Sequence, residues 1–477
     1  MTSAEIMSLL PLLVLAGAAV VVMLAAAFFR SHRLSLTLTL VGLVAAFASL
    51  PLAFAYTPRQ VTPILLIDGY ALFYMGLLFA ASFVVALLAY GYLEKGEANP
   101  EELYILLLLS TVGGAVLVAS SHFASFFLGL ETLSVSLYAM IAYNRTERRA
   151  IEAGIKYLIL AGVTAAFLLF GMALIYTDTG TLAFSGVVAA AAVRPSLMVM
   201  VGLGMLIVGV GFKLGVVPFH MWTPDVYQGA PAPVTGLVAS MSKGAMFALV
   251  LRYFTPIPPL ERQGLFLVFT TIAVLSMVGG NVLALIQDNV KRILAYSSIA
   301  HLGYLLVAFL ASGPAGQLAV AFYLVAYFAT TLSAFGVVTI LSTPDHEAER
   351  LEDYRGLFFR NPRLAVIFTI TLFSLAGIPP TAGLIGKIFI AAAGVQASLW
   401  FLLIVLVLAS VIGVFYYMRI VITMFRRPET EAAQQALTGL PRGASVALAA
   451  LSVILVGLGV YPVPVMTIIE NMVARLV

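Results

Sequence analysis

Five ionisable side chains lie inside long apolar stretches of this sequence. Glu131, Lys213, Lys243 and Lys387 stand among glycine and aliphatic residues, and Lys156 lies about two helical turns into another such stretch. If the stretches cross a membrane, each charge costs about 2.5–3.5 kcal/mol, and packing alone does not explain five of them. Burial favours the neutral form of a lysine, whereas a nearby carboxylate favours its charged form, so a moving neighbour changes its protonation. The pattern predicts a buried proton relay.

A structural explanation stays open for each of these residues. The ammonium group of Lys156 could extend to the membrane interface. Lys213 precedes a predicted helix break, where it could cap free carbonyl groups, whereas Lys243 has no interface within reach. Glu131 could be a fixed counter-ion for a lysine, which is compatible with proton transfer. A subunit whose buried charges only fix helix packing is therefore an alternative, although membrane helix interfaces more often use small residues and hydroxyls.

A polar face runs along residues 291–304. Ser297, His301 and Tyr304 are spaced four and three residues apart, which places them on one side of a helix. This face would connect the central lysine with the last one, through water or through the side chains themselves. Interhelical hydrogen bonding explains the serine and the tyrosine equally well. His301 differs because it titrates near neutral pH and is a natural intermediate carrier of protons.

The elements that must position these residues are membrane spans. The chain has 477 residues, of which 62% are hydrophobic and only 10% charged, and its mean hydropathy is +1.08. A soluble domain averages about 25% charged residues. Continuous apolar runs of about 20 residues match helices that cross a hydrocarbon core of about 30 Å, and their lack of alternation argues against a barrel. We expect an all-α integral membrane protein with about 14 transmembrane helices, near residues 5–29, 34–56, 70–93, 102–120, 122–144, 150–176, 196–217, 232–254, 264–286, 290–311, 316–342, 364–395, 399–424 and 444–466.

The seventh and twelfth of these spans contain glycine and proline at similar positions. The seventh reads GVVPFH from Gly215, and the twelfth reads AGIPPTAG from Ala376. Proline removes a helix donor and glycine loosens the neighbouring turn, so helices 7 and 12 should both be discontinuous. Matching breaks in two halves of a membrane protein indicate structural repeats around an ion path. The sequence therefore predicts two inverted five-helix repeats.

The predicted division of the chain follows from the five-span distance between the two breaks. A single membrane domain, 1–477, would contain helices 1–3 in residues 1–100, a first repeat of helices 4–8 in residues 101–255, a second repeat of helices 9–13 in residues 263–425, and helix 14 in residues 443–477.

Lysine and arginine fall mainly in the loops after odd-numbered spans. The positive-inside rule places these loops in the cytoplasm and both termini on the opposite side. The bases of the predicted cytoplasmic loops are Arg30, Arg33, Lys95, Arg145, Arg148, Arg149, Lys291, Arg292, Arg350, Arg355, Arg360, Arg363, Arg426, Arg427 and Arg442.

The sequence contains no cysteine. This absence excludes disulfides, thiolate metal sites and cysteine-ligated iron–sulfur clusters within the chain.

Three segments resemble the antiporter-like membrane subunits of respiratory complex I, the proton-translocating NADH:quinone oxidoreductase. They are FHMWTPDVYQGAP from Phe219, KRILAYSSIAHLGY from Lys291 and SLAGIPPTAGLIGK from Ser374, and the resemblance extends over nearly the whole chain. In that family, the L type would be expected to continue into a long lateral helix. The M type would be expected to carry a glutamate where this chain has Lys387. The pattern is therefore most similar to the N type.

The resemblance implies that all six candidate residues belong to one proton relay. It would contain an entry pair of Glu131 and Lys213, a residue that modulates this pair, Lys156, a central carrier, Lys243, an intermediate, His301, and a terminal carrier, Lys387. Electron transfer would occur in other subunits, which would hold FMN, iron–sulfur clusters, NADH and quinone, and this chain would hold no cofactor or metal.

The same resemblance implies a location and a set of partners. The chain would lie in the bacterial cytoplasmic (inner) membrane, with both termini on the periplasmic side. Its partners would be the M-type subunit, the small K- and J-type subunits, the lateral helix of the L-type subunit and membrane lipid, with no nucleic acid. Subunits of cation/proton antiporters and of related membrane hydrogenases share the fold and stay an alternative. Sodium-dependent transport without NADH oxidation would identify an antiporter.

Overall fold

Nearly all of the described chain is helical. The computed structural model describes residues 2–94, 99–193, 196–257, 259–343, 346–427 and 441–473. Thirteen helices are long and apolar enough to cross a membrane, and two shorter apolar helices, Pro362–Ala376 and Ala382–Gln396, follow one another in the chain. These two halves make the interrupted twelfth crossing, so the described residues supply the expected fourteen crossings. The prediction of an all-α membrane fold is confirmed.

The helices before the first break are α1 (Ser3–Ser8), α2 (Leu10–Phe28), α3 (His32–Ala48), α4 (Leu50–Phe54), α5 (Gly69–Leu93), α6 (Glu101–Ala119), α7 (Phe123–Ile141), α8 (Arg148–Thr179), α9 (Phe184–Val193) and α10 (Leu197–Leu214). The helices after it are α11 (Trp222–Gly229), α12 (Ala232–Leu237), α13 (Lys243–Phe254), α14 (Pro259–Leu285), α15 (Val290–Ala311), α16 (Gly313–Leu341), α17 (Leu357–Arg360), α18 (Pro362–Ala376), α19 (Ala382–Gln396), α20 (Trp400–Phe425), α21 (Arg442–Val460) and α22 (Val463–Val473). A π-helical turn, η1 (Val238–Ser242), joins α12 to α13, and a 3₁₀ turn, η2 (Leu351–Tyr354), precedes α17.

Polar caps and prolines set several helix ends. The side chains of Ser31, Ser196 and Asn289 accept hydrogen bonds from the first turns of α3, α10 and α15. Each of the first two spans is divided into two helices, α1 with α2 and α3 with α4. Pro11 and Pro51 stand at the second position of the later helix in each pair. Because proline has no amide hydrogen to donate, a helix tends to restart there rather than run through.

A short hairpin between α4 and α5 was not predicted. Strands β1 (Arg59–Val61) and β2 (Leu65–Ile67) pair antiparallel. Three-residue strands are too short to show an alternating pattern in the sequence. The hairpin leads into Asp68, whose carboxylate accepts a hydrogen bond from the Ala71 amide at 2.8 Å and so caps α5. Both of its oxygens also bind the Arg252 guanidinium, at 2.8 and 3.0 Å, which ties α5 to the end of α13.

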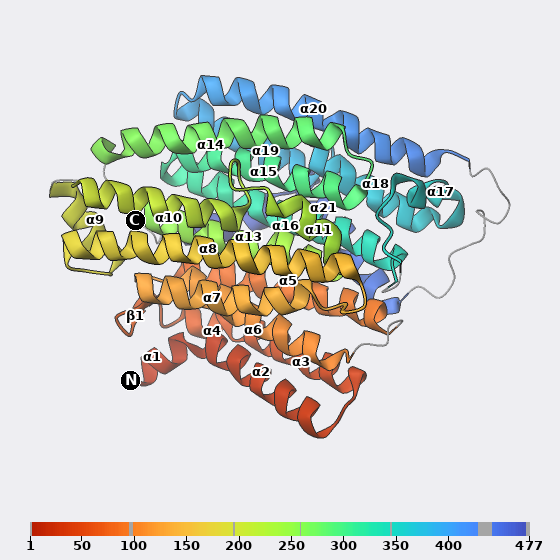
Figure 1. The fold of residues 1–477 in the computed structure, drawn as a ribbon, viewed down its shortest axis with the longest axis horizontal. Helices are drawn as coiled ribbons and strands as arrows, with labels where there is room; N and C mark the ends of the chain where they lie inside the picture. The colour runs from red at the N-terminus through yellow and green to blue at the C-terminus, as the bar shows by residue number, and fades with distance from the viewer. Residues whose placement is uncertain are drawn as a thin grey trace.

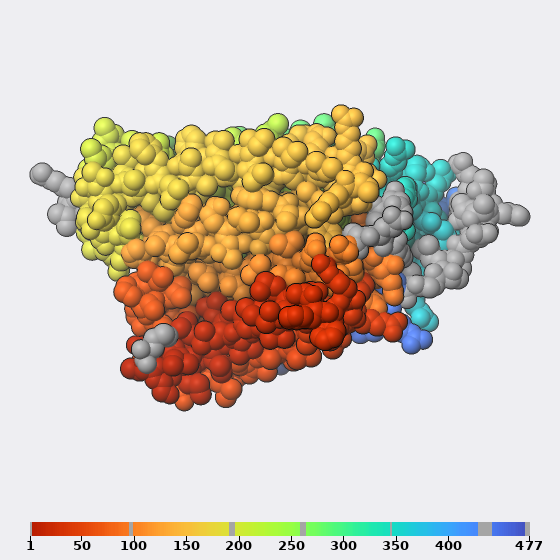
Figure 2. Space-filling view, turned by 60° about the horizontal axis from the view of Figure 1, so that its bottom comes forward, coloured from red at the N-terminus to blue at the C-terminus, as the bar shows by residue number. Residues whose placement is uncertain are grey.

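The helices run side by side across the bundle, and the two ends of the chain lie at the same side of it (Figure 1). Two groups of five crossings pack alike: α6 lies on α7 as α14 lies on α15, and α8 contacts α10 as α16 contacts α18. Since five is an odd number of crossings, the second group enters the bundle from the opposite side. Figure 2 shows the N-terminal helices, in red, along one edge, beside the orange and yellow helices of the first group. The residue limits of the repeats stay a prediction.

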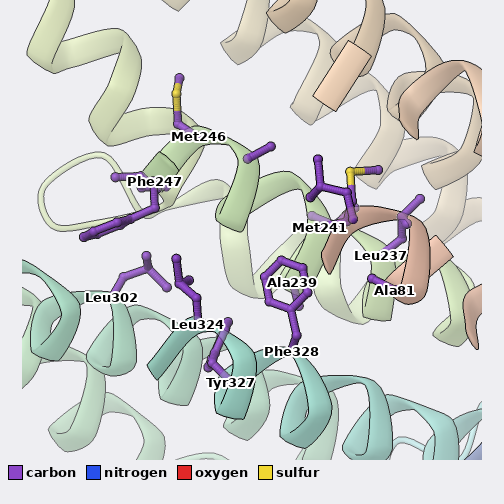
Figure 3. Close-up of a cluster of buried hydrophobic side chains, with 14 of the residues drawn as sticks. Ala81, Leu237, Ala239, Met241, Met246, Phe247, Leu302, Leu324, Tyr327 and Phe328 are labelled. Atoms are coloured by element: carbon purple, nitrogen blue, oxygen red, sulfur yellow. The ribbon is translucent and has the colours of Figure 1, made fainter. Parts of the chain in front are cut away.

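The eighth crossing, made of α12, η1 and α13, is the centre of the protein. The most apolar 18-residue stretch of this crossing is completely buried within the described structure. Figure 3 shows Met241 and Phe247 of this crossing opposite Phe328 of α16 and Leu302 of α15. A β-carbon on Gly244 would lie 2.3 Å from the Phe328 ring, so glycine is what lets the two helices approach. A polar group in this crossing is therefore enclosed by helices of both repeats.

Candidate functional site

The first predicted break is present between α10 and α11. Gly215 has a left-handed backbone, with φ 71°, and its amide and that of Val216 both bond to the Gly211 carbonyl, at 2.9 and 3.1 Å. This arrangement is a glycine-terminated helix end. The next free amide, that of Val217, donates to the Ser276 hydroxyl of α14 at 3.0 Å. The backbone groups released by the break are thus satisfied by neighbours, as a break within a membrane requires.

Lys213 lies in the last turn of α10 and is buried. Its Nζ donates to the hydroxyls of Ser134 and Tyr157, each at 2.9 Å. Glu131 is half-buried one helical turn before Ser134, whose hydroxyl binds Lys213. The predicted acid and base therefore lie in the same region. Among the described residues no ion pair joins them, and the ammonium donates to two hydroxyls.

Lys243 begins α13, directly after the π-helical turn η1, and is almost completely buried. Its Nζ donates to the Ser298 hydroxyl of α15 at 2.8 Å. The rings of Trp222 and Tyr227 lie beside it, with their centroids 5.9 and 5.3 Å from Nζ. Ser298 also hydrogen-bonds the Tyr327 hydroxyl at 2.7 Å. The central lysine thus contacts the first of two hydrogen-bonded hydroxyl groups, those of Ser298 and Tyr327, which belong to helices of the second repeat.

His301 lies one turn after Ser298 on α15 and is buried. Its Nδ1 hydrogen-bonds the Tyr323 hydroxyl at 2.7 Å, and its Nε2 hydrogen-bonds the Tyr417 hydroxyl at 3.2 Å. The predicted polar face of α15 is present, since Ser297 and His301 both hydrogen-bond the Tyr417 hydroxyl, but the central lysine contacts the residue next to Ser297. Ser298 contacts the central lysine, whereas Ser297 hydrogen-bonds Tyr417.

Lys387 lies on α19, after the second break, and is buried. Its Nζ donates to the carbonyls of Leu375 and Ala376, the last residues of α18, at 3.2 and 2.9 Å. The ring of Tyr304 lies beside it, 5.2 Å from Nζ. Gly377 ends α18 with φ 83°, and the predicted break of the twelfth helix is confirmed. The last lysine therefore caps the half-helix that precedes it.

Lys156 is not a buried charge. Its side chain is 43% exposed and forms ion pairs with Glu152 and Asp225, each at 2.8 Å. Its long side chain reaches two carboxylates, so Lys156 is both partly exposed and ion-paired. Asp225, which the sequence reasoning did not single out, also binds Arg292 of α15 at 2.9 Å. One carboxylate on α11 thus joins α8 of the first repeat to α15 of the second.

A second charged group missed by the sequence reasoning lies at the end of the bundle opposite to the chain ends. Lys291, counted above as a loop base, is fully buried and pairs with Glu347 at 3.0 Å. Glu347 also accepts a hydrogen bond from the Tyr92 hydroxyl at 2.7 Å. Burial opposes the charge of the neighbouring Glu349, but hydrogen bonds and nearby cations hold the pKa of Glu349 below its usual value. Both acids fold back onto the helices and close this end of the site.

The arrangement suits stepwise proton movement. Hydroxyl groups both donate and accept hydrogen bonds, so they can carry protons between lysines, whereas backbone carbonyls only accept. The described residues contain no group of three or more histidine, aspartate and glutamate side chains that could hold a metal ion. The broken helices, the buried lysines and the hydroxyls between them define an antiporter-like membrane subunit.

Comparison with known proteins gives the family. Residues 120–413 match the family described as the transmembrane region of NADH:quinone oxidoreductase and Mrp antiporter subunits. The NADH-quinone oxidoreductase subunit N of Ectopseudomonas mendocina (strain ymp) is 47% identical, covering 98% of this chain and 97% of the relative. The subunit N of Methylococcus capsulatus is 46% identical, covering 99% and 96%. The chain belongs to the NADH-quinone oxidoreductase subunit N family.

Two solved structures share the fold of this chain. A chain of respiratory complex I from Thermus thermophilus, determined with bound aureothin, is 33% identical with a TM-score of 0.82, covering 96% of this chain and 98% of that one. A chain of the Mrp complex from Dietzia sp. DQ12-45-1b shares the fold, with a TM-score of 0.86, at 20% identity and covering 100% and 98%. The second likeness concerns the fold alone.

Proposed function

We propose that this chain moves protons across the membrane as the N-type subunit of NADH:quinone oxidoreductase. One observation carries the proposal. Lys213, Lys243 and Lys387 are each at most 8% exposed, and in the described structure their hydrogen bonds go to hydroxyl and carbonyl oxygens rather than to carboxylates. A buried lysine without a counter-ion in contact exchanges its proton more readily than an ion-paired lysine.

The proposed route begins at Glu131, on the flank of α7 where Leu128 and Val135 are exposed and a neighbouring subunit could act on it. A change in the charge next to Glu131 alters how strongly Lys213 holds its proton. The proton then passes to Lys243. From there the hydroxyls described above lead toward the last lysine.

The second half of the route uses α15. Ser298 and Tyr327 take the proton from Lys243 toward His301, whose ring centroid is 5.7 Å from that of Tyr327. The ring of Tyr304 lies beside both His301 and Lys387, 5.4 Å from the histidine ring and 5.2 Å from Nζ, so the proton passes around it. Waters would complete the steps that exceed hydrogen-bond length. Lys387 is the terminal carrier, and Lys156 acts on the entry pair only indirectly, through Asp225.

The energy comes from quinone reduction elsewhere in the complex. FMN, the iron–sulfur clusters, NADH and quinone belong to other subunits in this proposal, and this chain is a translocating subunit without redox chemistry of its own. Its neighbours are the M-type subunit, the K- and J-type subunits and the lateral helix of the L-type subunit. The complex lies in the bacterial inner membrane, and the chain termini face the periplasm.

The test is Lys243→Ala in membranes that contain the assembled complex. Proton pumping and NADH:quinone turnover are measured per assembled complex, and we expect both to fall together. Normal pumping and normal turnover would overturn the proposal. Lys291→Met is the matched control, since it removes a buried lysine whose charge is balanced by Glu347. We expect this control to reduce the amount of complex while each assembled complex pumps normally.

An antiporter function is the second candidate, because the fold of the Mrp chain matches over the whole length. The two candidates differ in their driving reaction. Sodium-dependent proton movement in membranes without NADH would favour the antiporter. Proton movement that requires NADH oxidation favours the oxidoreductase, as do the two relatives at 46–47% identity.

A further inference from the structure

The indole ring of Trp222 is a neighbour of both of the first two lysine sites of the relay. Its centroid lies 4.8 Å from the ring of Tyr157, whose hydroxyl binds Lys213. It also lies 5.9 Å from Nζ of Lys243. The indole N–H is fixed because it donates to the Phe212 carbonyl at 2.8 Å. A proton cannot cross a carbon ring, so a route from Lys213 to Lys243 must pass around it.

The next residue, Thr223, provides a hydroxyl at this point. Thr223 is fully buried, and its Oγ1 has no hydrogen-bond partner among the residues that the structure describes. Buried hydroxyls in native proteins almost always have a partner, either a protein group or an ordered water. An orphaned hydroxyl beside an ion path therefore points to water at that place.

Gly215 lies next to both Thr223 and Lys243. A β-carbon on Gly215 would be 2.5 Å from Thr223 Oγ1, too close to be accommodated, and 3.3 Å from Lys243 Nζ. The hydroxyl and the lysine therefore approach the same glycine and lie within reach of one bridging water. Lysine has three N–H donors when charged, and only one is taken by Ser298 in the described structure. The remaining donors are available to a water beside the glycine.

A second unpartnered atom lies in the same connection between α10 and α11. Nδ1 of His220 is buried and has no hydrogen-bond partner in the described part of the chain. An unpartnered imidazole nitrogen in this connection also points to water at the break. The indole of Trp222 keeps the rest of this region apolar.

We propose that Thr223 carries the proton between the Lys213 side of the break and Lys243, through a water held beside Gly215. In the transfer, an N–H bond of the Lys213 ammonium breaks and leaves a neutral amine, its proton reaches the Thr223 hydroxyl through water, and this hydroxyl gives its own proton to the water beside Gly215. The water in turn gives a proton to the neutral amine of Lys243, so one N–H bond forms and the charge moves to the lysine. Threonine and water are regenerated, and no other reactant is needed. This inference rests on the proposed function and adds a residue to it.

The experiment compares Thr223→Val with Thr223→Ser in membranes containing the assembled complex. Valine keeps the shape of the side chain but removes the hydroxyl, and serine restores the hydroxyl. We expect Thr223→Val to lower coupled pumping by about tenfold, less than the 10²–10⁴-fold typical of a positioned acid–base group because water partly replaces it. Thr223→Ser should recover most of the activity. The solvent deuterium isotope effect on turnover should rise in the valine variant, since proton transfer then limits the rate.

Thr235→Val is the matched control. Thr235 is also fully buried, but its Oγ1 bonds to backbone carbonyls of Tyr227, Ala230 and Pro231, at 3.2–3.4 Å. Its loss should lower the amount of complex without raising the isotope effect. Normal pumping by Thr223→Val, or equal losses in the valine and serine variants, would overturn the inference.

The Lys243→Ala experiment separates this inference from the function on which it rests. If Lys243→Ala pumps normally, the proposed relay fails. If Lys243→Ala is inactive while Thr223→Val pumps normally, the relay stands and the role of Thr223 is wrong.

Discussion

The two helix breaks have the same backbone and different lysines. At both, a glycine with a left-handed backbone ends the first half-helix, with φ 71° at Gly215 and 83° at Gly377. In both, two successive amides bond to one carbonyl of the last turn, that of Gly211 in the first break and that of Phe373 in the second. The lysine of the first break precedes it, whereas the lysine of the second break follows it.

This difference changes what each lysine can bind. Lys213 contacts the hydroxyls of Ser134 and Tyr157, which can donate or accept and so suit either the charged or the neutral amine. Lys387 contacts two carbonyls at the C-terminal end of α18. Carbonyls only accept, and the end of a helix carries a partial negative charge, so this setting favours the charged ammonium. The first break suits proton transfer, and the second suits holding a proton before release.

The largest effects are expected when Lys213 and Lys387 are each replaced with methionine. Lys213→Met should lower proton pumping by about 100-fold or more, since a positioned acid–base group is lost. Its partners are hydroxyls that can turn toward other acceptors, so assembly should persist. Lys387→Met should also stop pumping, and it additionally leaves two buried carbonyls without this donor, at a cost of about 1–3 kcal/mol each. Pumping per assembled complex and thermal unfolding of the complex are the measurements.

Equal destabilisation by the two methionine variants would contradict the comparison. It would mean that Lys213 holds its surroundings as firmly as Lys387 holds the end of α18. The arginine variants sharpen the result, because a permanently charged group can replace the donor at Lys387 but cannot release a proton. Lys387→Arg should therefore recover stability without pumping.

A second test removes a carboxylate that only the first break has. Asp225 on α11 binds Lys156 and Arg292, whereas α19 contains no acidic residue. Asp225→Asn leaves two cations facing each other next to the half-helix that carries Trp222. We expect pumping to fall about fivefold, within the limit of about 1 kcal/mol for each partly exposed pair. Turnover and pumping are measured together in assembled complexes.

Asp225→Glu is the control for the carboxylate itself, and it should recover part of the activity. If Asp225→Asn pumps as well as the unchanged protein, then the ion pairs do not position α11. In that case the two breaks would differ only in their lysines.

The sequence predicted the positions of the two breaks better than it predicted which side chains contact one another around them. Glycine and proline at 215–218 and 377–380 located both interruptions, because these residues limit the backbone locally. The partner of Lys156 could not be predicted, since Asp225 lies 69 residues away and meets it only through the packing of α11 on α8. The buried state of Lys291 likewise depends on Glu347, which folds back from a loop 56 residues later.

Helix phase explains another difference between prediction and structure. Adjacent residues on a helix point about 100° apart, so the choice between Ser297 and Ser298 needs the rotation of α15 rather than its sequence. The π-helical turn before Lys243 has the same effect, because an inserted residue rotates the lysine relative to α12. Local sequence predicts which groups are present. Tertiary packing decides which of them meet.

The smallest expected effect comes from the serines at the two breaks. Ser134 binds Lys213 directly, whereas Ser374 accepts a hydrogen bond from the Gly383 amide and contacts no relay lysine in the described structure. Ser134→Ala should lower pumping about two- to threefold, since Tyr157 still holds the lysine and one hydrogen bond is worth about 1 kcal/mol. Ser374→Ala should cost about 1 kcal/mol of stability with normal pumping in each assembled complex. If Ser374→Ala reduces pumping as selectively as Ser134→Ala, then the second break also passes protons through hydroxyls, and the contrast between transfer and holding fails.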